Sequence, residues 1–137
     1  MKKLRLIINL WFPVLLWCGL IFYLSSIPNL RASPNPVWDE FIRSFAHGLF
    51  YAILYVLFFR AINFKKDQKD LWLPFWLGAL YGFSDELHQL FVPTRAFQFK
   101  DLLVDILGVL FGLFAVWKLL PKTPKKLKSL VKELGLS

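Results

Sequence analysis

The chain has 137 residues, enough for one domain and too few for two. Hydrophobic residues make up 57% of it, including 15 Phe and 6 Trp, which is more than a soluble domain of this length can bury. The net charge is +8, but the basic residues lie at the ends of apolar runs, where anionic lipid headgroups attract them, so we expect membrane lipids and no nucleic acid as partners.

Four long apolar runs follow one another along the chain. They cover residues 6–27, 41–62, 71–92 and 102–120. Each is close to the ~20 residues that a helix needs to cross about 30 Å of hydrocarbon. The sequence therefore predicts an all-α, polytopic membrane protein, a four-transmembrane-helix bundle with short loops.

The first run raises the alternative of a cleaved signal peptide. Its uninterrupted part, residues 6–24, is longer than the usual apolar core of a signal, and no small-residue cleavage site follows it closely. We therefore expect a retained anchor, in which Pro13 is tolerated. After this run Pro34 and Pro36 predict a loop that reaches to residue 40.

The basic residues predict the topology. The N-terminus, the connection between the second and third runs and the C-terminal tail are rich in Lys and Arg. Arg31, Arg43, Arg95 and Lys100 fall on the other side of the membrane. The positive-inside bias then places both termini in the cytoplasm and the chain in the cytoplasmic membrane as a multi-pass protein. We divide it into a membrane domain, residues 1–120, and a basic amphipathic tail, residues 121–137, which either lies on the inner leaflet or only enforces the topology.

Small residues recur at a four-residue spacing in the last two predicted helices. The third contains Gly78 and Gly82, and the fourth contains Gly108 and Gly112. Such pairs allow helices to approach closely, so we expect these two helices to pack together or against their neighbours.

Polar residues gather near the outer ends of three of the four predicted helices. A charge at the centre of a bilayer costs about 2.5–3.5 kcal/mol on insertion scales, so such residues need a reason. The second helix contributes His47, the third contributes Asp85, Glu86, His88 and Gln89, the next loop contributes Arg95, and the fourth helix contributes Asp101 and Asp105. We expect these groups to form a polar pocket at the outer leaflet.

Helical spacing orders these groups further. Arg43, His47 and Tyr51 share one face of the second helix. We expect Arg95 to pair with a carboxylate, which leaves other carboxylates free to transfer protons or to hold a cation. His and carboxylates suit divalent ions, but no spacing here matches a known zinc motif, so we expect no metal site and no cofactor.

The run from Tyr81 to Arg95 (YGFSDELHQLFVPTR), with the pattern D-x3-D-x2-G-x3-G that starts at Asp101, resembles the VanZ-like family of small bacterial membrane proteins. The sequence FYLSS at residues 22–26 and the motif A-H-x3-Y around His47 resemble the family's other marks. The resemblance covers nearly the whole chain apart from the lysine-rich tail.

Two positions depart from the family pattern. Thr94 stands where the family usually has Gly, and we expect it to stiffen the outer loop. Ser44 stands where many members carry Lys, so a cation near His47 is missing.

The family takes its name from a member associated with resistance to teicoplanin, a lipid-tailed glycopeptide antibiotic that acts on cell-wall precursors. The resemblance thus implies a role at the cell envelope, linked to glycopeptide resistance. We expect the pocket to bind or modify a lipid-linked or amphiphilic molecule whose phosphate or carboxylate contacts Arg95.

Three other hypotheses fit the same residues: a membrane-embedded hydrolase or transferase, a structural scaffold, and a small transporter subunit. The sequence does not decide whether the protein is an enzyme, what its ligand is, or how many subunits assemble. In the enzyme hypothesis Asp85, Glu86 and His88 carry the chemistry, and the binding contacts come from His47, Tyr51, Gln89, Arg95, Asp101 and Asp105.

Overall fold

The computed structural model describes residues 2–64 and 69–119, and all regular structure within them is helical. The elements are α1 (Lys2–Ser25), α2 (Pro36–Asn63), α3 (Trp72–Gln89) and α4 (Phe99–Phe114), and α4 continues into a π-helical turn, η1 (Ala115–Leu119). The prediction of an all-α chain is confirmed for these residues. The predicted tail at 121–137 lies outside them.

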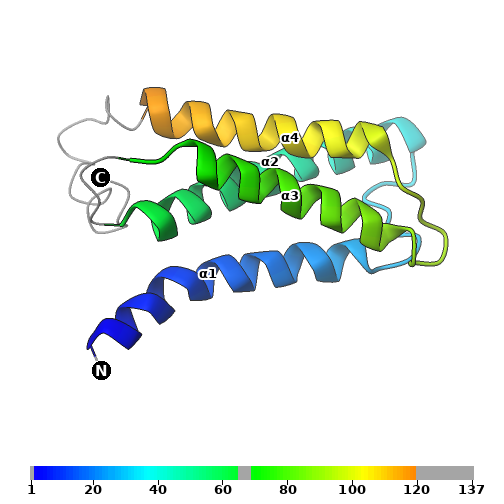
Figure 1. Ribbon diagram of the computed structural model, residues 1–137. Helices are drawn as coiled ribbons and strands as arrows, with labels where there is room; N and C mark the ends of the chain where they lie inside the picture. The colour runs from blue at the N-terminus through cyan, green and yellow to red at the C-terminus, as the bar shows by residue number, and fades with distance from the viewer. Residues whose placement is uncertain (1, 65–68, 120–137) are drawn as a thin grey trace.

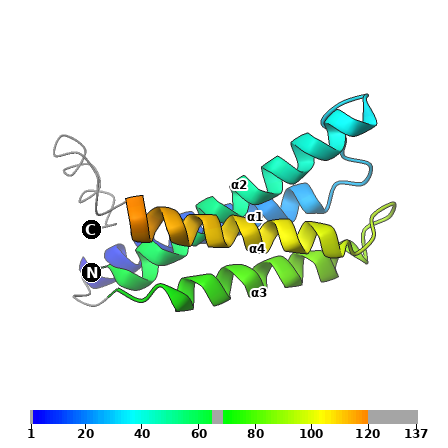
Figure 2. The ribbon, with the colours of Figure 1, turned by 90° about the horizontal axis from the view of Figure 1, so that it is seen from above.

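The four α-helices run side by side along one long axis, and α2 contacts each of the other three. The α1–α2 and α3–α4 connections lie together at one end of the bundle, opposite the N-terminus (Figures 1 and 2). We call this the loop end and define it by the connections 26–35 and 90–98. The most extensive contact joins α2 to α4.

The helix boundaries differ from the predicted ones for local reasons. The helix α2 begins at Pro36 rather than at residue 41, because the Asn35 side chain accepts hydrogen bonds from the N–H groups of Val37 and Trp38. The prediction that Pro36 lies in a loop was wrong. A proline fits the first helical position because the N–H that it lacks would have no partner within the helix there. Similarly, α3 ends at Gln89, before the predicted residue 92, and α4 begins at Phe99 instead of residue 102.

Glycine makes the α2–α4 contact close. A Cβ atom at Gly108 would lie 2.3 Å from the Gly48 carbonyl oxygen, and one at Gly112 would lie 2.7 Å from the Ala52 carbonyl oxygen. Neither position accepts a side chain unless the helices separate. The predicted spacing of small residues thus marks a real helix interface, which we call the α2–α4 seam, formed by these four residues.

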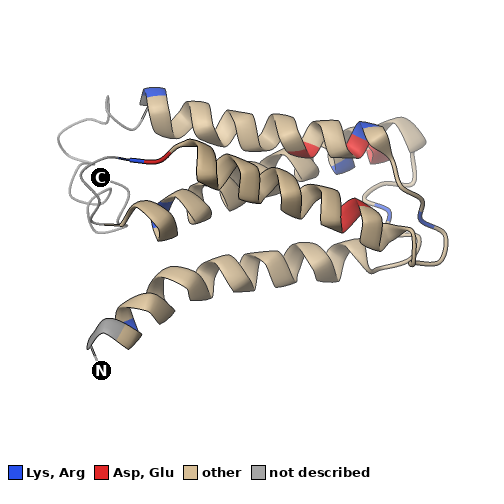
Figure 3. Ribbon diagram, in the orientation of Figure 1, with Lys and Arg blue, Asp and Glu red and all other residues tan. Residues whose placement is uncertain are grey.

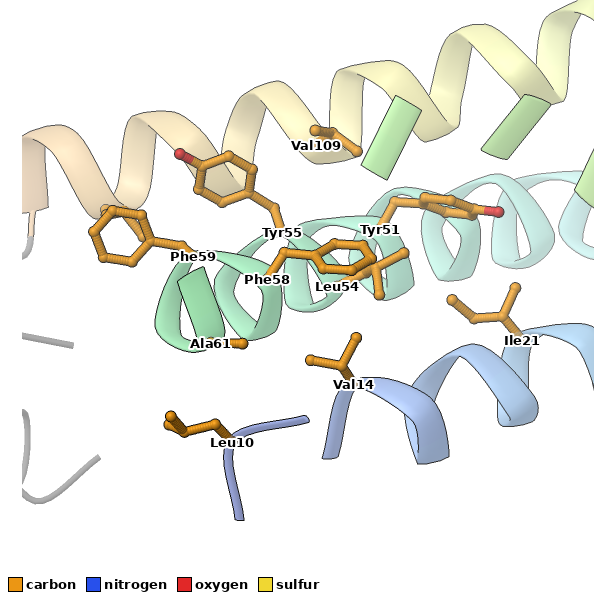
Figure 4. Close-up of a cluster of buried hydrophobic side chains, with 11 residues drawn as sticks. Leu10, Val14, Ile21, Tyr51, Leu54, Tyr55, Phe58, Phe59, Ala61 and Val109 are labelled. Carbon is orange, nitrogen blue, oxygen red and sulfur yellow. The ribbon is translucent and has the colours of Figure 1, made fainter. Parts of the chain in front are cut away.

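Most of the apolar core lies in the half of the bundle away from the loop end, and Tyr51 and Ile21 extend it toward that end. Figure 4 shows Tyr55, Phe58 and Phe59 of α2 between Val109 of α4 and the residues of α1. Two cross-helix hydrogen bonds dock α1 on this core: Trp17 Nε1 donates to the Phe50 carbonyl at 3.0 Å, and the Tyr81 hydroxyl donates to a carbonyl of α1 at 2.6 Å.

Large apolar side chains are exposed on the outside of all four helices, among them Leu15, Phe45, Trp76 and Phe111. Within the described residues, Leu4–Ser25 of α1 and the whole of α2 are long and apolar enough to cross a membrane.

Candidate functional site

The acidic residues gather at the loop end. Among the described residues, all of them except Asp70 lie in that half of the bundle (Figure 3). Four of these carboxylates and the amide of Gln89 are buried there, at most 6% exposed: Asp85, Glu86, Asp101 and Asp105. Buried carboxylates are costly unless they are paired, hydrogen-bonded or protonated, so their partners decide what the cluster does.

His47 and Asp105 form a direct contact between titratable side chains of two different helices. His47 Nδ1 lies 2.8 Å from Asp105 Oδ1, which joins α2 to α4. The α2–α4 seam causes this contact, since His47 directly precedes Gly48 and Asp105 lies one turn before Gly108. Glu86 of α3 completes a group of three, in which one ligand atom from each residue lies within 4.8 Å of the others.

Neutral donors hold the carboxylate oxygens of Asp85 and Glu86. Gln89 Nε2 donates to Glu86 Oε1 at 3.2 Å and to Asp85 Oδ2 at 3.4 Å. The Gln98 backbone N–H donates to Glu86 Oε2 at 3.0 Å, and Ser25 Oγ donates to Asp85 Oδ1 at 2.6 Å. Within the described residues, no Lys or Arg forms an ion pair with these carboxylates.

Within the described residues Arg95 pairs with no carboxylate, so that expectation was wrong. Its Nε and Nη2 atoms donate to the Ile27 carbonyl at 3.2 and 3.1 Å, and Nη2 also donates to the Leu24 carbonyl at 3.2 Å. The last carbonyls of a helix have no partner within that helix, and a cation at the C-terminus suits the helix dipole. Burial lowers the pKa of the Arg95 guanidinium, and the nearby Arg43 cation lowers it further.

The structure separates His88 from the predicted group. The His88 ring stacks on Phe22 with the ring centroids 4.2 Å apart, and its Nε2 lies 3.0 Å from Ser26 Oγ. His88 thus faces α1, whereas Glu86 faces α2 and α4. Asp101 lies in the first turn of α4, as predicted, and its carboxylate makes no side-chain hydrogen bond to the described residues.

A cavity of about 100 Å³ lies beside the carboxylates. Its polar lining includes Arg43, His47 and Tyr51, in agreement with the predicted shared face of α2, together with Asp85 and Arg95. A neighbouring cavity of about 170 Å³ is lined by Arg43 and Arg95 as well. Both arginines therefore face the same region of the loop end.

The residues predicted for catalysis and binding did not include three contributors. Ser25 binds Asp85, Gln98 binds Glu86 through its backbone, and Arg43 lines both cavities. Two of them had a signal in the sequence. Ser25 belongs to the FYLSS motif, and the i, i+4 spacing places Arg43 beside His47 on α2. No sequence signal identifies a backbone N–H donor.

The arrangement is able to perform two kinds of chemistry. The cavity presents two guanidinium groups to an anion, and the His47–Asp105 pair has the geometry of a base that a carboxylate orients.

A family model described as VanZ/LLP1 matches residues 10–120, which confirms the resemblance seen in the sequence. No curated protein and no solved structure matches the chain.

Proposed function

The chain belongs to the VanZ/LLP1 family, and on that premise we propose that it is a multi-pass protein of the bacterial cytoplasmic membrane that binds an anionic amphiphile at its loop end. The family and the two long apolar helices indicate a membrane protein. Four spans are supported by the way α3 and α4 run beside α2 and by their exposed Trp76, Leu80 and Phe111. The basic bias of the sequence supports cytoplasmic termini, with the loop end outside.

The observation that carries this proposal is a pair of incompletely paired guanidinium groups in one cavity. Arg43 Nε is buried and makes no hydrogen bond within the described residues. Its distance of 3.6 Å from Asp39 Oδ2 is too long for one. The Nη1 atom of Arg95 likewise makes no hydrogen bond to the described residues. A phosphate or carboxylate between the two arginines would supply the missing acceptors and relieve their mutual repulsion.

The rest of the cavity wall fits an amphiphile rather than a free anion. Ile21, Leu24 and Phe50 line it together with the arginines. A volume of about 100 Å³ suits a headgroup, so the acyl chain would leave the cavity along the apolar outer surface of the helices.

Thermal stability in a neutral detergent tests this proposal. Short-chain phosphatidic acid should raise the melting temperature of the purified protein, and phosphatidylcholine of the same chain length should not. Arg43→Gln should abolish the rise and leave the ligand-free melting temperature nearly unchanged, because its Nε contributes no hydrogen bond.

Arg31→Gln is the matched control, since Arg31 is exposed at the loop end and lines neither cavity. Equal stabilisation of the wild type and Arg43→Gln, or equal stabilisation by both lipids, would contradict the proposal.

A second candidate, a hydrolase or transferase that acts on a lipid phosphate, is favoured by the His47–Asp105 contact at 2.8 Å. Here His47 is the general base and Asp105 orients its ring, whereas the sequence had assigned the chemistry to Asp85, Glu86 and His88. His47→Gln should then stop phosphate release and preserve lipid binding, and His88→Gln should preserve both. Binding without turnover of any phosphorylated lipid would rule this candidate out.

The link to glycopeptide resistance is a further part of the proposal. A susceptible host that expresses the protein should become less sensitive to teicoplanin, and Arg43→Gln should remove that protection. Equal sensitivity with and without the wild-type protein would separate this chain from the resistance role.

A further inference from the structure

We propose that His47, Glu86 and Asp105 bind a divalent transition-metal cation of the zinc class. This site adjoins the cavity of the two arginines, which His47 also lines, but its argument does not depend on the lipid. It lies where α2, α3 and α4 meet at the loop end, and each helix supplies one ligand.

Geometry gives the first support. One ligand atom from each of the three residues lies within 4.8 Å of the other two. Zinc binds nitrogen and carboxylate oxygen at about 2.0–2.2 Å, which places neighbouring ligand atoms roughly 3–4 Å apart. Small rotations of the side chains would therefore close the site, and no helix has to move.

Buried polar atoms without partners give the second, independent support. Within the described residues, Asp105 Oδ2 and the Tyr51 hydroxyl are buried and make no hydrogen bond, and both side chains are only 1% exposed. Both side chains lie against Gly82 of α3. A Cβ atom built on Gly82 would lie 3.5 Å from Asp105 Oδ2 and 3.2 Å from Tyr51 Cε1, the ring carbon next to the one that carries the hydroxyl.

A cation at this place would satisfy both groups. It would take Asp105 Oδ2 as a ligand, and the Tyr51 hydroxyl would donate to a ligand oxygen or to a water molecule on the metal. Nothing else within the described residues does so, and a buried carboxylate oxygen left unpaired is costly.

The charge of the site gives the third support. Asp85 lies next to Glu86, and the donors that reach these two carboxylates, Ser25, Gln89 and the Gln98 N–H, are all neutral. The guanidinium of Arg95 is directed to the end of α1 instead. A divalent cation would balance these carboxylates, with which no Lys or Arg of the described residues forms an ion pair.

The donor set selects the kind of metal. One imidazole with two carboxylates suits zinc and similar first-row ions better than Mg²⁺, which prefers oxygen ligands alone. Gln89 Nε2 and the Gln98 N–H already donate to the two oxygens of Glu86, as outer partners usually orient a metal ligand.

The test uses the full chain in neutral detergent, purified with an affinity tag that contains no histidine and stripped of metal by a chelator. Zn²⁺ alone, without lipid, should bind at about one ion per chain by elemental analysis and should raise the melting temperature. Mg²⁺ at the same concentration should do neither. Glu86→Gln, Asp105→Asn and His47→Gln should each weaken Zn²⁺ binding at least about tenfold.

The controls are His88→Gln, which changes the chain's other histidine, and Glu40→Gln, which changes an exposed carboxylate at the same end. Both should bind Zn²⁺ as the wild type does. Binding that survives all three ligand substitutions, or that His88→Gln removes, would overturn the proposal, as would a wild-type chain that takes up no Zn²⁺. If Asp105→Asn does not fold, Glu86→Gln and His47→Gln decide. Because no lipid is present, failure here leaves anion binding by Arg43 intact.

Discussion

Tyr51 and Tyr55 lie one turn apart on α2, and both are almost fully buried, yet they belong to different halves of the molecule. The Tyr55 hydroxyl donates to the Leu71 carbonyl at 3.1 Å, whereas the Tyr51 hydroxyl has no partner within the described residues. Their rings point in opposite directions along the bundle (Figure 4). Within the described residues, the apolar half leaves no buried side-chain N or O atom without a hydrogen bond.

The loop end does not satisfy its polar groups. The buried side-chain atoms that lack a hydrogen bond among the described residues belong to Arg43, Tyr51 and Asp105, and all three lie at this end. Such atoms are rare in native proteins and call for an explanation. The comparison teaches that the apolar half and the α2–α4 seam hold the bundle together, while the loop end contains buried polar atoms that have no partner among the described residues.

The seam joins the two halves, so breaking it should have the largest effect. In Gly108→Ala the new Cβ would lie 2.3 Å from the Gly48 carbonyl oxygen, which is backbone and does not rotate away. We expect a loss of about 3 kcal/mol in the free energy of unfolding, the upper part of the range for overpacking, and a low folded yield in detergent. Both are measured by thermal melting and size-exclusion chromatography.

Gly19→Ala is the matched control, because a Cβ at Gly19 meets nothing within 4 Å. This variant should be as stable as the wild type or slightly more stable, since alanine favours the helix. If Gly108→Ala melted at the temperature of Gly19→Ala, the seam would not be the element that holds the halves together.

The two tyrosines test the comparison directly. Tyr55→Phe leaves the Leu71 carbonyl without its donor and should cost about 1–2 kcal/mol of stability. Tyr51→Phe removes a hydroxyl that has no partner among the described residues, so it should be neutral or slightly stabilising in metal-free protein. The measurement is thermal melting of both variants after chelator treatment. A larger loss for Tyr51→Phe than for Tyr55→Phe would show that the loop end is part of the structural core.

Much of the fold was predictable because the length and the apolar character of a helix can be read from the sequence without knowing how the helices pack. The four helices and the close packing at Gly108 and Gly112 follow from such patterns. The boundaries were less accurate because caps are local. Asn35 extends α2 through Pro36 by accepting two backbone hydrogen bonds, and hydropathy does not contain that information.

The site was predictable in its members but not in its pairings. Depth along a helix follows from residue number, so His47, Glu86 and Asp105 were expected at one level. Which of them meet depends on the rotation of three helices about their axes, and only packing fixes it. For that reason His88, one turn from Asp85, faces α1, and Arg95 binds the end of α1 rather than a carboxylate. The sequence also contains no metal-ligand spacing, because each proposed ligand comes from a different helix.

The smallest expected effect concerns strain at the loop end. Among the described non-glycine residues, Asn29 and Thr94 have positive φ angles, 53° and 68°, and both lie in the loop-end connections. Asparagine tolerates this region, but a β-branched threonine does not. The resemblance to the family had already marked residue 94 as a position where glycine is usual, and the φ angle supplies the reason.

The Thr94 side chain also has a structural role, because its Oγ1 accepts a hydrogen bond from the Asn29 N–H at 3.1 Å and so ties the two connections together. Thr94→Gly relieves the strain and loses this bond, so its net change in stability should be close to zero. Thr94→Ala loses the same bond and keeps a Cβ in the left-handed region. We therefore expect Thr94→Gly to be more stable than Thr94→Ala by about 1 kcal/mol. Thermal melting of the two variants side by side isolates the backbone, since neither has the hydroxyl. If the alanine variant were equally stable, the connection would relax without cost, and the loop end would differ from the apolar half in its unpaired polar atoms but not in backbone strain.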